Sequence, residues 1–231
     1  MTKKGIHIVF LFLFCFQIYS QSKGDSLALN FNLKYNKLPF EVNKKYVSSK
    51  KDTLTVETFR CYISNIQIQY DDQSVITQKD SYHLIDSDIP DSFKFYLTKK
   101  NDKIISKVFF NIGIDSLTNT AGALAGDLDP TKGMYWAWQS GYINMKIEGK
   151  SSSCKSRKNE FQFHIGGYLS PYYAMRKVEL TYEKKATQIN IGIDLYNFFA
   201  NLNLAKTNSV MIPGTLAMEL ADYSKSLFYI E

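Results

Sequence analysis

Alternation of apolar and polar residues is the feature that most constrains how this chain can fold. Leu27, Leu29, Phe31 and Leu33 are separated by single polar or small residues, which is the period of a strand with one buried face. The same period recurs in the segments 66–70, 143–147, 161–165, 178–182 and 189–195. Short segments of this kind, separated by polar turns, predict a sandwich or a barrel.

A nearly continuous apolar run at 108–114 predicts a further buried strand. Helix signals are confined to the short segments 195–202 and 216–223. We therefore expect an all-β fold, an antiparallel β-sandwich or a partly open barrel, with one or two short helices. The periodicity does not choose between sandwich and barrel, because the two differ in closure of the sheet.

The N-terminus has the features of a secretory signal. Two lysines precede an apolar run at 6–16, and a polar stretch begins at Gln21. The apolar run is shorter than the ~20 residues needed to cross a bilayer, so no transmembrane span is expected. We predict that residues 1–20 are a signal peptide and that 21–231 form a single β domain, located in the periplasm or outside the cell.

Charge and aromatic content narrow the class of protein further. Removing Lys3 and Lys4 with the signal peptide lowers the formal net charge from +6 to +4, and the remaining lysines are scattered among carboxylates. This balance gives no support for a nucleic-acid partner. The 16 Tyr and 16 Phe residues supply enough large apolar surface for one sizeable core.

Two cysteines remain after processing. Cys61 lies in an apparent strand and Cys154 in a polar loop. Disulfides persist in exported proteins, but a bridge requires Cα atoms within about 7 Å of each other. The sequence therefore leaves both a disulfide and two free thiols open.

The sequence contains no complete catalytic motif, since GxSxG, HExxH, P-loop and Rossmann glycine patterns are all absent. Only His83 and His164 remain after export. Asp127 and Asp129 lie in Gly-Asp-Leu-Asp-Pro, which predicts either a turn held by Asx hydrogen bonds or a calcium site that lacks EF-hand spacing. We expect that the protein is not an enzyme. An enzymatic function would require His164 to lie in a cleft beside a carboxylate.

Both tryptophans of the chain lie in the segment 133–142. If that segment is extended, Met134, Trp136 and Trp138 project to one side, because side chains alternate faces along a strand. The stripe is then either part of the core or a patch of one thioether and two indoles. An intact indole nitrogen is a hydrogen-bond donor only and does not ligate a metal.

The two histidines differ in their surroundings. Alternation places His164 on the face opposite Phe161, Phe163 and Ile165, so it is either a hydrogen-bonded surface residue or a metal ligand. His83 is the weaker candidate, because its predicted strand contains nothing else that favours a ligand.

Several segments, taken together, resemble the MbnP-like family of exported β proteins associated with copper. The matching segments are Tyr62-Ile63-Ser64-Asn65-Ile66, Phe110-Asn111-Ile112-Gly113-Ile114-Asp115-Ser116, Gly126-Asp127-Leu128-Asp129-Pro130, Gly133-Met134-Tyr135-Trp136-Ala137-Trp138, Ser140-Gly141-Tyr142, Lys146-Ile147-Glu148-Gly149 and Phe163-His164-Ile165-Gly166-Gly167. Each is short, but their order and spacing cover most of the mature chain. The Met-x-Trp-x-Trp-x-x-Gly-Tyr segment is the most specific of them.

The resemblance implies a copper-binding protein whose site is completed by an oxidised tryptophan. It also implies a partner, a diheme enzyme related to cytochrome c peroxidases, that converts the tryptophan to kynurenine and so creates an aryl amine and a carbonyl. On this reading Met134 and His164 are copper ligands, with His83 as a further candidate, and either Trp136 or Trp138 is modified. Thioether and imidazole ligands suit copper.

A second hypothesis belongs to another class of function. The chain would be an extracytoplasmic adhesion or ligand-binding module that holds no metal. Exposure of both Trp136 and Trp138, with no histidine nearby, would favour this alternative.

Overall fold

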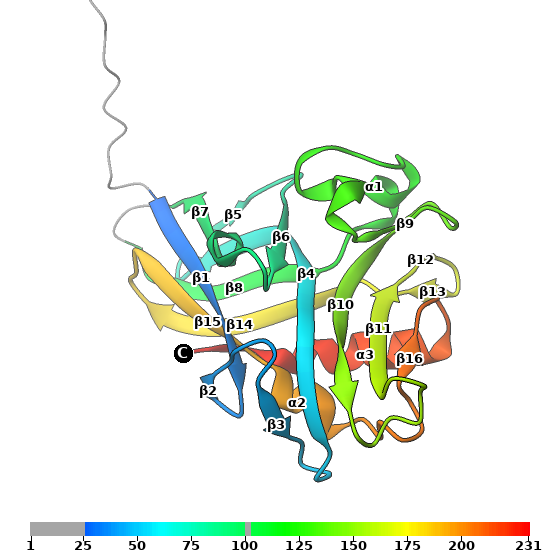
Figure 1. Ribbon diagram of the computed structural model, residues 1–231. Coiled ribbons are helices and arrows are strands. Elements are labelled where there is room, and N and C mark those ends of the chain that lie inside the picture. The colour runs from blue at the N-terminus through cyan, green and yellow to red at the C-terminus, as the bar shows by residue number, and fades with distance from the viewer. Residues whose placement is uncertain (1–25, 100–102) are drawn as a thin grey trace, which may run out of the picture.

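The computed structural model describes residues 26–99 and 103–231 (Figure 1). The predicted signal peptide, 1–20, lies outside the described residues. Over the described part of the chain the expected fold class is confirmed, since strands dominate and the helices are few and short. No helix in this part is long and apolar enough to cross a membrane.

The smaller of the two main sheets is built around the first described strand. Its members are β1 (Ser26–Tyr35), β2 (Leu38–Pro39), β7 (Lys94–Thr98), β15 (Gln188–Asp194) and β17 (Phe228–Ile230). β1 pairs antiparallel with β2 and β7 but parallel with β15. The parallel pair departs from the antiparallel expectation, because most of the chain separates β1 from β15 and no tight hairpin dictates their direction.

The larger sheet has ten strands and curls around β4 (Figure 1). Its members are β3 (Lys45–Val47), β4 (Thr53–Tyr70), β5 (Val75–Thr77), β6 (Tyr82–Asp86), β8 (Ile105–Ile112), β9 (Tyr135–Trp136), β10 (Gly141–Ser151), β11 (Glu160–Gly166), β14 (Arg176–Lys184) and β16 (Ser209–Val210). The first half of β4 pairs with β10 and the second half with β8. A small separate hairpin is formed by β12 (Tyr168–Leu169) and β13 (Tyr172–Tyr173).

The main core lies between the two sheets. Phe31 of β1 meets Phe110 of β8 edge to face, with ring centroids 5.7 Å apart, and Phe110 meets Phe228 of β17 at 5.1 Å. The alternating apolar residues of the predicted strands supply most of this core. Edge-to-face aromatic pairs add to the free energy gained from burying their area.

Two helices form where the sequence predicts them, and both pack on the core. They are α2 (Leu195–Ala200) and α3 (Thr215–Ser224). Phe198 and Phe199 of α2 contact Phe163 and Phe161 of β11, with centroid distances of 5.8 and 5.4 Å. Phe161 and Phe163 therefore place one face of β11 in the core. His164 lies between Phe163 and Ile165 in the strand, so its side chain is on the other face.

A long connection between β8 and β10 covers one end of the outer face of the larger sheet (Figure 1). It contains α1 (Ser116–Thr120), which the sequence analysis missed, two 3-10 turns at Gly126–Leu128 and Pro130–Lys132, and β9. Its apolar side chains and those of the sheet beneath form a second buried cluster, here called the outer-face cluster: Tyr62, Leu84, Ile114, Leu128, Met134, Trp136, Tyr142 and Ile143.

The alternation predicted for 143–147 is broken in one place. Met145 and Ile147 point into the main core, as expected, but Ile143 belongs to the outer-face cluster. The cause is a register irregularity in β10 between Ile143 and Met145, since an extra residue in a strand turns the preceding side chains to the other face.

Candidate metal centre

The outer face of the larger sheet carries a row of polar side chains on four neighbouring strands. His164 of β11 lies opposite Lys146 of β10, Lys146 opposite Arg60 of β4, and Arg60 opposite Asp86 of β6. Of these, His164, Lys146 and Asp86 are buried. Directly opposite residues on adjacent strands point to the same face, so the register alone brings these four side chains into one line.

His164 is held by a carboxylate on the neighbouring strand. Its Nε2 lies 2.6 Å from Oε1 of Glu148, a diagonal neighbour that the sequence analysis did not single out. The hydrogen bond from His164 lowers the pKa of Glu148 below its ordinary value, against the opposing effect of burial. Within the described residues Nδ1 of His164 makes no hydrogen bond, so Nδ1 is the ring nitrogen available to a ligand.

Lys146 and Arg60 form hydrogen bonds that hold the connection between β8 and β10 against the sheet. Lys146 Nζ donates a hydrogen bond to the Gly133 carbonyl at 2.5 Å, and Arg60 Nη1 donates to the Lys132 carbonyl at 3.2 Å. Gly133 has φ +69°, a left-handed conformation that glycine adopts without strain. Burial lowers the pKa of Lys146. These contacts fix the backbone immediately before Met134.

Met134 and Trp136 are both buried in the outer-face cluster. The six-membered ring of Trp136 lies against Gly166, where an added Cβ would be 2.7 Å from Trp136 Cζ3. Gly166 and His164 are two residues apart and share one face of β11. The structure therefore places Trp136 against the face of β11 that also carries His164, and Met134 belongs to the same covering segment.

The indole Nε1 of Trp136 is buried, and no atom of the described residues accepts a hydrogen bond from it. A buried donor without an acceptor costs free energy, typically about 1–3 kcal/mol. Such groups are rare in folded proteins and call for a specific explanation. Here the unpaired group lies in one of the two tryptophans, Trp136 and Trp138, that the resemblance leaves as candidates for modification.

Trp138 does not lie on the same side as Met134 and Trp136. β9 ends at Trp136, and the chain turns over 137–140, with Gln139 N donating to the Trp136 carbonyl at 3.3 Å. Trp138 is 64% exposed, whereas Trp136 is 6% exposed. Their ring centroids are nevertheless 5.8 Å apart. The extended arrangement considered for 133–142 therefore breaks at the turn.

His83 is separated from the other predicted ligands by the sheet itself. It lies opposite Ile63 on β4, a core residue, and its ring stacks on Phe95 at 4.2 Å. Its Nε2 is 3.1 Å from Gln78 Oε1, and burial lowers its pKa. His83 is thus on the core side, whereas His164 is on the outer face, so the structure does not bring the two histidines together.

The two cysteines are free and buried. Cys61 is part of the main core, and burial raises the pKa of its thiol. Neither thiol faces the outer-face cluster, since both belong to the main core. The open question of pairing is answered in favour of two thiols, and a soft ligand from Cys61 is not part of this centre.

The aspartates of the Gly-Asp-Leu-Asp-Pro turn have structural roles. Asp129 accepts hydrogen bonds from the backbone N and the hydroxyl of Thr131, which is an Asx turn. Asp127 accepts from the Leu84 N at 3.0 Å and pairs with Lys132 at 2.6 Å. Across the described residues no group of three or more His, Cys, Asp or Glu side chains is arranged to hold a metal ion. A metal at this face would need other donors.

The pairing of His164 with Glu148 bears on the enzymatic hypothesis. It provides the carboxylate that this hypothesis required. The histidine, however, is buried, and no hydroxyl or thiol of the described residues is hydrogen-bonded to it. The geometry is that of an oriented imidazole without a nucleophile beside it.

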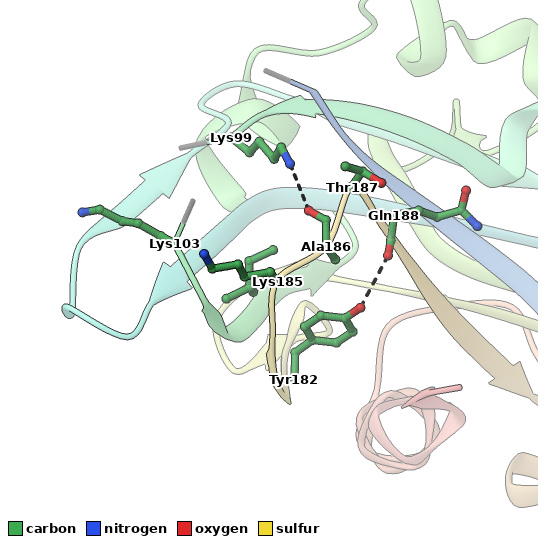
Figure 2. Close-up of a pocket in the computed structure, with 8 residues that line it drawn as sticks. Lys99, Lys103, Tyr182, Lys185, Ala186, Thr187 and Gln188 are labelled. Carbon is green, nitrogen blue, oxygen red and sulfur yellow. Dashed lines mark hydrogen bonds between the residues drawn. The ribbon is translucent and has the colours of Figure 1, made fainter. Parts of the chain in front are cut away.

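A lysine-lined cavity of about 490 Å³ lies elsewhere, where β7, β8 and the turn between β14 and β15 meet (Figure 2). Lys99 Nζ donates to the Ala186 carbonyl at 3.2 Å, and Lys103 pairs with Asp72. In Figure 1, β7 and the turn between β14 and β15 lie on the opposite side of the molecule from β9. None of the predicted site residues lines this cavity.

Comparison with known proteins agrees with this architecture. The profile of the MbnP family matches residues 24–212, beginning just after the predicted signal peptide. A solved structure, MbnP from Methylosinus trichosporium, superposes with a TM-score of 0.63 and 12% sequence identity, covering 83% of each chain, which shows a shared fold. No curated protein matches the sequence. Because the profile spans most of its length, the chain belongs to the MbnP family.

Proposed function

We propose that this protein is an exported copper-binding protein whose site consists of Met134, His164 and the oxidised side chain of Trp136. Family membership supports the metal, and the arrangement of the outer face supports the residues. His83 is left out of the proposed site because it faces the core.

The observation that carries the proposal is the position of Trp136. Its ring lies on Gly166, which shares a face of β11 with His164, and its buried Nε1 has no acceptor within the described residues. An intact indole cannot ligate a metal, since its nitrogen has no free lone pair in the ring plane. Kynurenine at the same position would present an aryl amine and a ketone beside the imidazole, so oxidation supplies the donor that this face lacks.

The donor set suits copper. A thioether and an imidazole are ligands that copper accepts readily, with the thioether favouring the cuprous ion. Bound copper would supply a soft, redox-active ion at this face. Glu148 would orient His164 through Nε2 and leave Nδ1 for the metal, the usual division of roles between the two ring nitrogens of a ligating histidine.

Location and partner follow from the family and the N-terminus. We propose that residues 1–20 direct export to the periplasm or beyond. A diheme enzyme related to cytochrome c peroxidases would then carry out the oxidation. The copper-binding protein itself has no catalytic role in this proposal.

The test is peptide mapping and copper analysis of protein purified from its native host. Kynurenine at Trp136 raises the mass of its peptide by about 4 mass units, because a ring carbon is replaced by oxygen. Tandem mass spectra assign the change to Trp136 or Trp138. We expect the change at Trp136, together with one copper ion per chain.

Two histidine variants provide a matched control. His164→Gln should lose copper, whereas His83→Gln should retain it, because the two rings lie on opposite faces of one sheet. Unmodified tryptophans and no copper in protein from copper-replete cells would refute the proposal. The metal-free binding module would then be the better account, with exposed Trp138 as its contact residue.

A further inference from the structure

The two indoles of this protein differ in access but touch each other. Trp136 is buried in the outer-face cluster, and Trp138 is exposed on the turn that follows. Their ring centroids are 5.8 Å apart, with an interplanar angle of 44°. An oxidant approaching this face therefore meets Trp138 first, and Trp138 in turn contacts the residue proposed for modification.

We propose that Trp138 is an electron relay through which Trp136 is oxidised, an inference that rests on the proposed function. The oxidant is a high-valent haem protein that accepts one electron at a time. One electron passes from Trp138 to that haem, whose iron is reduced by one unit. The Trp138 radical cation then takes one electron from Trp136. Trp138 ends neutral and Trp136 carries the radical, with no bond made or broken and no proton moved in these two steps.

Distance explains why such a relay is needed. Electron tunnelling falls off exponentially with separation, and the burial of Trp136 keeps any external haem away from its ring. Ring contact with Trp138 replaces one long transfer by two short ones. Trp138 is regenerated in this sequence and lies outside the proposed copper site. Its role is to pass electrons from Trp136 to the oxidant.

Tyr62 and Tyr142, the two tyrosines of the outer-face cluster, are poor competitors for the radical. A tyrosine must lose its phenolic proton to be oxidised easily, and the Tyr62 and Tyr142 hydroxyls donate to backbone carbonyls, which do not accept protons. Burial also raises the pKa of both phenols. Neither of these two phenols therefore readily takes the radical from the indole of Trp136.

The test uses the mature chain, 21–231, and tris(bipyridine)ruthenium(III) as a one-electron oxidant. The oxidant is generated by light from the ruthenium(II) complex, with a pentaamminecobalt(III) salt as the electron acceptor. Oxidation at each tryptophan is measured by tandem mass spectrometry. Trp138→Phe removes the redox-active ring but keeps an aromatic side chain. Trp138→Tyr restores a redox-active ring whose phenolic proton, unlike those of Tyr62 and Tyr142, can pass to water because position 138 is exposed. Tyr173→Phe is the matched control, since Tyr173 is an exposed aromatic residue for which no ring contact with Trp136 is found.

We expect Trp136 to be oxidised in the wild type and in Tyr173→Phe, to fall to the level of unilluminated protein in Trp138→Phe, and to recover in Trp138→Tyr. Because Trp138 is largely exposed, the melting temperature should be the same in all four proteins. Undiminished oxidation of Trp136 in Trp138→Phe would overturn the relay. So would wild-type protein oxidised at Trp138 alone, or at neither residue.

Failure of the relay can be distinguished from failure of the proposed function. If the relay is wrong but the function is right, wild-type protein from the host still contains kynurenine at Trp136 and copper. If the function is wrong, that host protein contains neither, whatever the ruthenium experiment shows.

Discussion

His164 Nε2 and Glu148 Oε1, on neighbouring strands of the larger sheet, are 2.6 Å apart. The pair fixes the orientation of the imidazole and leaves Nδ1 without a hydrogen-bond partner among the described residues. In metal centres such a carboxylate holds the histidine in the ligating tautomer.

Glu148→Gln should weaken cuprous ion binding by about 10–100-fold, the usual loss when the partner of a ligating histidine is removed. Competition with a chromophoric cuprous chelator measures the affinity. Glu57→Gln is the control, since Glu57 forms an ion pair with Lys150 on the exposed surface and has no contact with His164. Equal affinities for Glu148→Gln and wild type would show that Glu148 does not support the ligand.

The same pair predicts a dependence of stability on pH. The pKa of Glu148 in the folded protein is below its ordinary value of 4.5, so the charged carboxylate stabilises the native state above that pH. This contribution is lost as the pH falls through the lowered pKa of the folded state. The difference in unfolding free energy between wild type and Glu148→Gln should therefore shrink below about pH 4.5. Denaturant titrations across this range measure it, and a difference independent of pH would contradict the prediction.

Gly166→Ala should displace the ring of Trp136. The added Cβ would lie 2.7 Å from both Trp136 Cζ3 and the Tyr142 carbonyl oxygen, closer than any normal contact. Overpacking of this kind costs about 1–3 kcal/mol, and the displaced indole should show red-shifted fluorescence. Gly214→Ala is the control, because its Cβ would meet nothing within 4 Å. A Gly166→Ala protein with wild-type fluorescence and stability would show that the glycine is not required by the indole.

Both thiols should resist modification in the native protein. Cys61 is fully buried and Cys154 nearly so, and burial raises the pKa of both thiols, which suppresses the reactive thiolate. Intact mass after alkylation of the mature chain should show no adduct under native conditions and two in denaturant. Dithiothreitol should leave the melting temperature unchanged. A mass showing no free thiol in denaturant would instead indicate a disulfide.

The sequence was sufficient to predict most of the strands and to predict which side chains of each strand face the core. The alternation at 27–33 and 161–165 predicts the residues that fill the core, because a period of two fixes which side chains share a face. It also predicts that His164 points away from that core, as observed. It does not reveal the irregularity in β10, because a bulge depends on the pairing partner and leaves no fixed residue pattern.

The candidate centre was predicted only in part. Met134, Trp136 and His164 were recognisable because unusual residue types occur in a specific order. Glu148 was missed, although Lys146 and Glu148 share the outward parity of their strand, because its importance depends on the register between β10 and β11. Trp138 was grouped with Trp136 because nothing in the local sequence shows that the strand ends between them.

The sequence by itself determined the fold class, the family and which residues carry unusual chemistry, since these follow from local periodicity and from residue order. Tertiary structure decided which of these residues meet. The sequence offers both His83 and His164 as candidate ligands, yet strand pairing puts one ring on Phe95 in the core and the other beside Glu148 on the outer face. Contacts between residues far apart in the chain depend on register and on the path of the covering segment, and neither is encoded in any single stretch of sequence.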